Sequence, residues 1–104
     1  MAKLKAVFFL PLFDNDGRDL SQEISDLEFE MFATFVAFTR SGLVTGAYLM
    51  ADGRRMDDEL WSYFVVFEEN RIPELRDIIA RFKAKTTQEW IYFELQYNTF
   101  VDFV

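Results

Sequence analysis

Carboxylates are the side chains of this sequence with the most capacity for chemistry. The chain has 104 residues, of which 18 are acidic and 11 basic, and it contains no histidine and no cysteine. Histidine-based acid–base catalysis, zinc held by histidine or thiolate, a cysteine nucleophile and a disulfide framework are therefore excluded. The net charge of −7 also disfavours a surface built to bind nucleic-acid phosphates.

The acidic loop at residues 14–19 has some features of a calcium site. An EF-hand loop needs glycine as its sixth residue and a bidentate glutamate as its twelfth. Counting from Asp14, the glycine comes fourth, at Gly17, and the twelfth residue is Ser25. The loop therefore predicts a turn followed by the start of a helix.

A second carboxylate group, Asp57, Asp58 and Glu59, follows Arg54 and Arg55. Neighbouring residues of a strand point to opposite faces, so only Asp57 and Glu59 share one and could bind magnesium weakly. We favour a solvated strand entrance with cross-strand ion pairs. The serines have no histidine partner and no phosphate-binding P-loop motif is present. No residue set therefore predicts a catalytic site, a metal site or a cofactor.

Hydrophobic periodicity predicts the elements that position these groups. Strands are expected at residues 3–13, 43–50, 58–67 and 89–97, with a two-residue hairpin at Asp52-Gly53. One helix is expected to begin near Ser21 and to end at Ser41-Gly42, since glycine commonly follows a helix. A second helix is expected to follow Pro73, which suits a first helical turn.

One face of each element is expected to form the core. Both faces of the first strand are largely apolar, which is typical of a central strand. The predicted core residues are Leu4, Ala6, Phe8, Leu10, Leu27, Met31, Phe35, Leu60, Phe64, Val66, Leu75, Ile78, Ile79, Phe82, Ile91, Phe93 and Leu95.

The predicted order is β-α-β-β-α-β, which is typical of the ferredoxin-like, split β-α-β arrangement. The fold class is therefore α+β, with a four-stranded antiparallel sheet and both helices on one face. Residues 1–104 are expected to form a single domain, in which 99–104 is a short apolar C-terminal tail. RNA-recognition modules share this order, but the third strand here lacks their basic and glycine residues and has acidic ends.

Eight aromatic side chains lie on the expected strands at positions that alternate with the predicted core residues, and they are expected on the face of the sheet that no helix covers. A monomer rarely leaves a large apolar patch in water. We therefore predict a homodimer through this face, with Trp61 and Trp90 contributing most, unless the tail covers the patch or pairs with a neighbouring subunit's edge strand. The predicted interface residues are Phe9, Phe13, Tyr48, Trp61, Tyr63, Phe67, Trp90 and Tyr92.

The amino-terminal segment does not have the pattern of a signal peptide. Pro11 interrupts its apolar run, and aspartates follow where small residues would precede a cleavage site. No later apolar run approaches the roughly 20 residues that a membrane-spanning helix needs. We expect a cytoplasmic protein with no membrane partner.

Four segments of the chain resemble a group of small, uncharacterised bacterial and phage-associated proteins of ferredoxin-like type. They are Pro11–Gly17, Phe35–Thr39, Gly46-Ala47-Tyr48 and Gln88–Glu94. The resemblance extends over nearly the whole chain. This sequence departs from the group at Val36-Ala37, where Gly-Gly is expected, and at Tyr48, where tryptophan is expected. The resemblance implies the fold but no activity.

Three functions follow as hypotheses. The first is a non-enzymatic interaction or regulatory module that acts as a homo-oligomer. The second is an acidic protein, of the nucleic-acid-mimic or inhibitor type, that binds a basic surface of a partner protein and does not bind nucleic acid directly. The third is an enzyme that binds a small molecule. A contiguous acidic stripe would favour the second hypothesis, and scattered carboxylates would favour a solvated surface.

Overall fold

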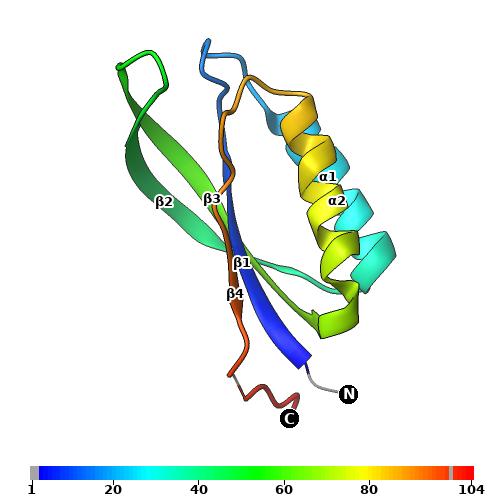
Figure 1. Cartoon of the computed structure of the whole chain (residues 1–104). Coiled ribbons are helices and arrows are strands. Elements are labelled where there is room, and N and C mark those ends of the chain that lie inside the picture. Colours follow the sequence, from blue (N-terminus) through cyan, green and yellow to red (C-terminus); the bar gives the residue numbers. More distant parts are fainter. Residues whose placement is uncertain (1–2, 99) are drawn as a thin grey trace.

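The structure is a computed structural model that describes residues 3–98 and 100–104, so Thr99 at the start of the expected tail lies outside it. Along the chain the elements are β1 (Lys3–Pro11), α1 (Ser21–Phe35), β2 (Thr39–Leu49), β3 (Arg55–Glu68), a 3-10 turn η1 (Glu69–Arg71), α2 (Ile72–Ala84) and β4 (Phe93–Gln96) (Figure 1).

The four strands form one antiparallel sheet in the order β2-β3-β1-β4. Figure 1 shows α1 and α2 side by side on one face of this sheet, while the β2–β3 hairpin extends away from them. The α+β class, the antiparallel sheet and the central position of β1 are confirmed. We call the face opposite the helices the open face.

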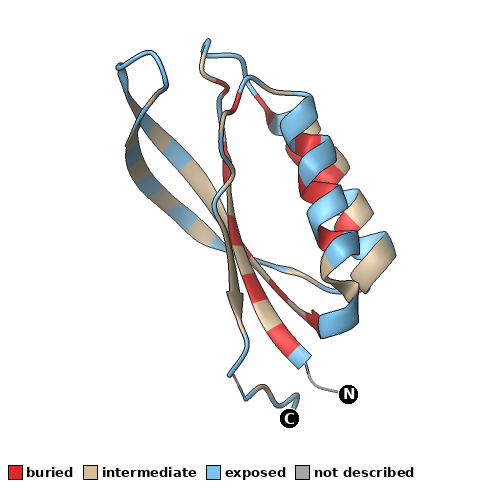
Figure 2. Cartoon of the chain, in the orientation of Figure 1, coloured by how far each residue is buried: buried red, intermediate tan, exposed pale blue. Residues whose placement is uncertain are grey.

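The core lies between β1, β3 and the two helices, as the buried residues in Figure 2 show. Leu4, Ala6, Phe8 and Leu10 of β1 are buried, and so are Leu27, Met31, Leu75, Ile78, Ile79 and Phe82 of the helices, all as predicted. Pro11 of β1 and Ile24 of α1 are buried as well, which was not predicted. Phe35, Ile91, Phe93 and Leu95 are only partly buried, but they pack against this core. Alternation in β1 and helical spacing in α1 and α2 therefore place the right residues inside.

The predicted core face of β3 is wrong. Tyr63, Val65 and Phe67 are buried, whereas Leu60, Phe64 and Val66 are only partly buried. The register opposes Phe8 to Tyr63 and Ala6 to Val65, so these side chains share the helix-covered face. Tyr63 is tolerated there because its hydroxyl donates a hydrogen bond to Glu28 on α1 and its ring stacks on Phe8.

The end of α1 also differs from the prediction. The helix begins at Ser21, as expected, where the Ser21 N–H donates to the Asp19 carboxylate at 2.7 Å. It ends at Phe35, because Val36 adopts a left-handed conformation with φ of 68°. Ser41-Gly42 belongs instead to an irregularity of β2 between Arg40 and Gly42, where Gly42 has φ of 135°.

The last strand is shorter than predicted. Regular pairing of β4 covers only Phe93–Gln96, and residues 88–92 reach β1 through the single backbone hydrogen bond from Phe9 N–H to Tyr92 O. Within the described part of the chain, no helix combines the length and apolar character needed to cross a membrane.

Candidate binding groove

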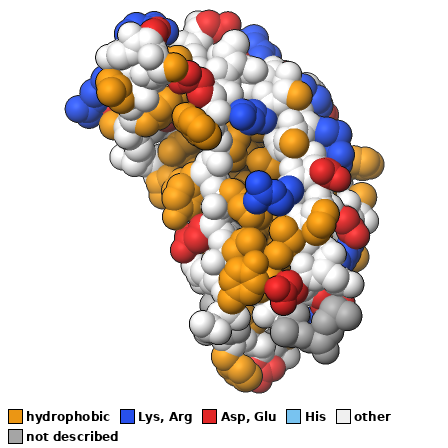
Figure 3. Space-filling model, in the orientation of Figure 1, with side chains coloured by type: hydrophobic (Ala, Val, Ile, Leu, Met, Phe, Trp, Pro, Cys, Tyr) orange, Lys and Arg blue, Asp and Glu red, His pale blue; other side chains and the backbone are white. Residues whose placement is uncertain are grey.

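A groove of about 440 Å³ lies on the open face, between the hairpin and residues 88–92. Hydrophobic side chains gather along β4 and toward the hairpin in Figure 3. Phe9, Pro11 and Leu60 form its floor, Tyr48 and Leu49 line the hairpin side, and Gln88, Trp90, Ile91 and Tyr92 line the other. Its size is within the range typical of small-molecule sites.

The floor of the groove is apolar and is kept open by a glycine. Phe9 points to the open face and stacks on Tyr92 with ring centroids 4.6 Å apart. Gly46 of β2 lies opposite Asp58 of β3. A Cβ atom at Gly46 would come within 3.3 Å of Leu60 Cδ1, so any larger residue would fill space that the groove now occupies.

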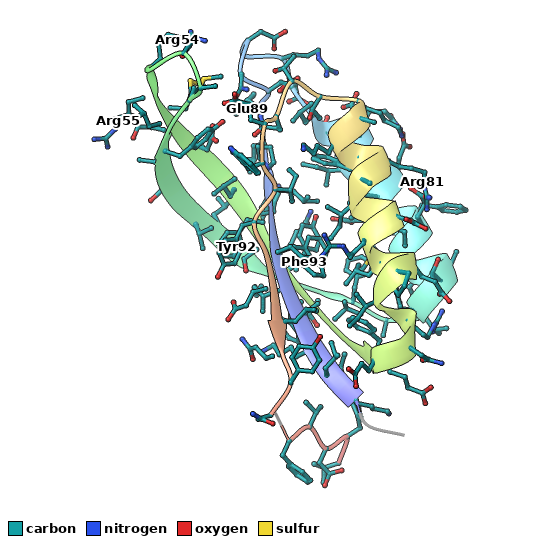
Figure 4. The ribbon with its side chains drawn as sticks, in the orientation of Figure 1. Arg54, Arg55, Arg81, Glu89, Tyr92 and Phe93 are labelled. Carbon is teal, nitrogen blue, oxygen red and sulfur yellow. The ribbon has the colours of Figure 1, made fainter. Side chains whose placement is uncertain are left out.

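The wall at residues 88–92 is held in place by two contacts at its start. Gln88 is buried, and its amide donates to Asp14 Oδ1 at 3.1 Å and to Asn15 Oδ1 at 3.2 Å. Glu89 Oε2 accepts a hydrogen bond from the Ala51 N–H of the hairpin at 3.3 Å. Figure 4 shows Tyr92 pointing toward the hairpin and Phe93 pointing toward α2, so the chain separates groove and core residues here.

Asp14 is the centre of the polar network behind this wall. It accepts hydrogen bonds from the Thr87 N–H and hydroxyl, the latter at 2.7 Å, and it pairs with Arg18 at 3.3 Å. Burial alone would raise the pKa of Asp14, but the hydrogen bonds from Thr87, Asn15 and Gln88 outweigh it and hold the pKa at about 2. The loop is therefore a turn that fixes residues 86–88.

Asp58 is the one carboxylate among the described residues that line the groove. It has no hydrogen-bond or ion-pair partner among the described residues, whereas its neighbour Asp57 pairs with Arg55 at 2.9 Å. Burial raises the pKa of Asp58, and the negative charges of Asp57 and Asp14 raise it further. Tyr48, which also lines this end, donates its hydroxyl to Asn15 Oδ1 at 3.2 Å. Burial raises the pKa of Tyr48, and the charges of Asp58 and Glu89 add to that effect.

The structure brings together four of the eight predicted interface residues. Phe9, Tyr48, Trp90 and Tyr92 all line the groove. The expectation that the other aromatics share the open face is wrong for β3, because Tyr63 and Phe67 are buried in the core and Trp61 packs against it. All three residues were misplaced for the same reason, which is that the core face of β3 is the opposite of the predicted one.

Phe13 and Trp61 line a different hollow, of about 330 Å³, beside the start of α1. Here the Arg40 guanidinium lies 4.4 Å from the centre of the Trp61 ring and pairs with Glu28 at 3.1 Å. Because Glu28 also accepts the Tyr63 hydroxyl, a ligand in this hollow would have to displace interactions already made. We therefore regard the groove as the better site.

Three groove residues were missed or misjudged from sequence. Asp58 was expected to be solvated like its neighbours, and neither Gly46 nor Gln88 was assigned a role. The alternation of side chains along the strand places Asp58 on the face opposite Asp57 and Glu59, and this is the sequence feature that could have distinguished it. In the described residues, no three histidine, cysteine, aspartate or glutamate side chains are arranged to hold a metal ion.

The sequence matches no protein-family model, and no curated protein is significantly similar to it. A function for this chain is therefore inferred from its own sequence and geometry.

Proposed function

We propose that this chain is a non-enzymatic interaction module that works as a homodimer, joined through the outer edge of β2. The observation that supports the proposal is a long edge strand with almost no charge. β2 is outermost in the sheet and pairs only with β3 among the described strands. It runs for 11 residues, and between Arg40 and Asp52 the sequence has no charged side chain.

Such an edge presents a row of unpaired backbone N–H and C=O groups to any extended partner. Soluble proteins protect edges with charges, proline, bulges or short strands. β2 has one irregularity near its start, and beyond it Leu43 and Leu49 are 55% and 71% exposed. A second copy can supply an identical strand, which gives a two-fold symmetric pairing.

The other edge is protected. β4 has only four residues and includes Glu94, and the chain bends away after Gln96. Exposed apolar side chains do follow it, at Tyr97, Phe100, Phe103 and Val104. Phe103 lies against Lys3, whose ammonium is 5.4 Å from the ring centre. This C-terminal surface is the rival site for a partner.

The geometry gives little support to catalysis. Thr87 has a hydroxyl bonded to the Asp14 carboxylate, which is the usual arrangement of a nucleophile and a base. A carboxylate with a pKa of about 2 is a very weak base at neutral pH, and Asp14 is already saturated with donors. Thr87 and Asp14 are therefore structural.

The acidic-partner hypothesis has no comparable support. Among the described residues, eight carboxylates form ion pairs, spread over the loop before α1, α1 itself, the hairpin and α2: Asp14, Glu23, Asp26, Glu28, Glu30, Asp52, Asp57 and Glu74. A mimic of nucleic acid would need these charges free to meet a basic surface.

Solution mass over a dilution series tests the dimer. Edge pairing of one strand buries less than the roughly 800 Å² per partner of a standard interface, so we expect a weak, concentration-dependent dimer. The variant Leu43→Lys/Leu49→Lys places like charges across the pairing and should be monomeric. Its matched control, Phe100→Lys, adds a charge at the rival surface and should dimerise as the wild type does.

Two results would contradict the proposal. One is a wild-type protein that stays monomeric at high micromolar concentration. The other is a dimer that survives Leu43→Lys/Leu49→Lys but is lost in Phe100→Lys, which would assign self-association to the C-terminal surface.

We further propose that the fold is the ferredoxin-like, split β-α-β arrangement. Read from the β4 edge, the strand order is β4-β1-β3-β2, and β3 lies between β1 and β2, which α1 connects. This order and the position of both helices on one face support the assignment. The same observations agree with the resemblance to small ferredoxin-like proteins, which stays a proposal.

A further inference from the structure

The groove on the open face has the properties of a formed binding site. Its floor is part of the sheet, and its two sides are tied together by the hydrogen bond between Ala51 N–H and Glu89 Oε2. The buried Gln88 fixes the base of one wall. A ligand would therefore find the walls already in position, which reduces the entropy lost on binding.

The charge around the groove is negative at one end. Asp58 has no partner there among the described residues, and the charge of Glu89 acts on Tyr48 at the same end. The closest arginines of the hairpin are already paired, Arg54 with Asp52 at 2.7 Å and Arg55 with Asp57 at 2.9 Å. A cation is therefore the ligand group that this end can stabilise.

The rest of the groove is apolar and aromatic. Trp90 is 76% exposed, and Tyr92 presents a half-exposed ring that Phe9 supports from below. Exposed rings of this kind stack on flat apolar groups and attract cations to their faces. The apolar part of a ligand would fit between these rings and Leu60.

We propose that this groove binds an organic ammonium ion with a flat, apolar body. The ammonium nitrogen donates hydrogen bonds to the Asp58 carboxylate, and the body lies over Leu60 beside Trp90 and Tyr92. Although β2 contributes Gly46 and Tyr48 to the groove, the site is complete within one copy and does not rest on the dimer.

Calorimetric titration with three probes that share one body tests this assignment. The probes are 2-naphthylethylammonium, 2-naphthylethanol and the carboxylate naphthaleneacetate. They share the naphthalene body and carry a cationic, a neutral or an anionic end. A charge-assisted hydrogen bond is worth enough for the amine to bind about tenfold more tightly than the alcohol, and the acetate should bind least. Wild-type protein that binds the amine and the alcohol equally, or binds neither, would overturn the proposal.

Three variants distinguish a loss of binding in the groove from a loss of the folded structure. Asp58→Asn should abolish the preference for the amine over the alcohol. Glu59→Gln, on the opposite face of the same strand and in no ion pair among the described residues, is the matched control and should keep it. Gly46→Ala should weaken both probes, because its Cβ fills the groove. If Asp58→Asn keeps its circular dichroism spectrum and the full preference for the amine, Asp58 does not hold the ammonium and the proposal fails.

Discussion

Asp14 is the residue whose ionisation contributes most clearly to stability. Its pKa of about 2 in the folded protein lies below the ordinary value of 3.8. A lowered folded pKa gives stability that is fully present above pH 3.8 and is lost as the pH falls through about 2. The shift corresponds to about 2 kcal/mol.

We therefore expect Asp14→Asn to lose about 2 kcal/mol of unfolding free energy at neutral pH and to show less acid sensitivity than the wild type. Urea unfolding at a series of pH values between about 5 and 2 measures this. Asp16→Asn, in the same loop, is the control and should keep the wild-type acid dependence. If the unfolding free energy depends on pH in the same way in the wild type and in Asp14→Asn, the Asp14 carboxylate is not the source of the acid sensitivity.

Tyr63 and Phe64 test the corrected face of β3. Tyr63 is fully buried between the helices and the sheet, whereas Phe64 lies on the open face with the Lys5 ammonium 4.4 Å from its ring centre. Tyr63→Ala should cost about 3–5 kcal/mol of unfolding free energy, and Phe64→Ala clearly less. Chemical denaturation measures the loss of unfolding free energy in each variant. A larger loss for Phe64→Ala than for Tyr63→Ala would mean that Phe64, and not Tyr63, lies on the core face of β3.

Among the elements, α1 ends on an unfavourable residue. Val36 has φ of 68°, and a left-handed conformation costs a branched residue roughly 1–2 kcal/mol, which glycine avoids. The Val36 side chain is 71% exposed, so its removal loses little burial. Val36→Gly should therefore stabilise the protein by about 1 kcal/mol, even after the greater freedom of glycine in the unfolded chain is counted.

Thermal unfolding of Val36→Gly and of the neighbouring control Ala37→Gly checks this prediction. The first should raise the midpoint and the second should not. Equal effects of the two substitutions would mean that the backbone at Val36 is not strained.

The elements also show which features a sequence can specify. The stripes of α1 and α2 have only one apolar solution, so their core faces can be predicted. Both faces of β1 are largely apolar, but Lys3 and Lys5 lie on only one of them, which leaves the face of Leu4, Ala6, Phe8 and Leu10 as the core face. In β3 both faces are apolar, and the choice depends on a partner for the Tyr63 hydroxyl, Glu28, that only the fold supplies. Gly42 indicated left-handed backbone, which is equally suited to a helix end and to a bulge.

At the scale of the whole molecule, placing both helices on one face leaves the open face and the β2 edge available. The uncovered face could be predicted from the element order. The groove could not, because it depends on Gln88 and Glu89, which reach Asp14, Asn15 and Ala51 from distant parts of the chain. Long-range polar contacts of this kind leave no periodic signal in a sequence.

Amide hydrogen exchange at two protein concentrations tests the central claim, self-association through β2, most directly. Pairing with a second copy would protect the outward N–H groups of β2, which face solvent in the monomer. We predict that exchange in residues 39–49 slows as the concentration rises from low to high micromolar, while exchange in residues 93–96 does not change. Exchange in β2 that is independent of concentration, or new protection confined to residues 97–104, would contradict the account.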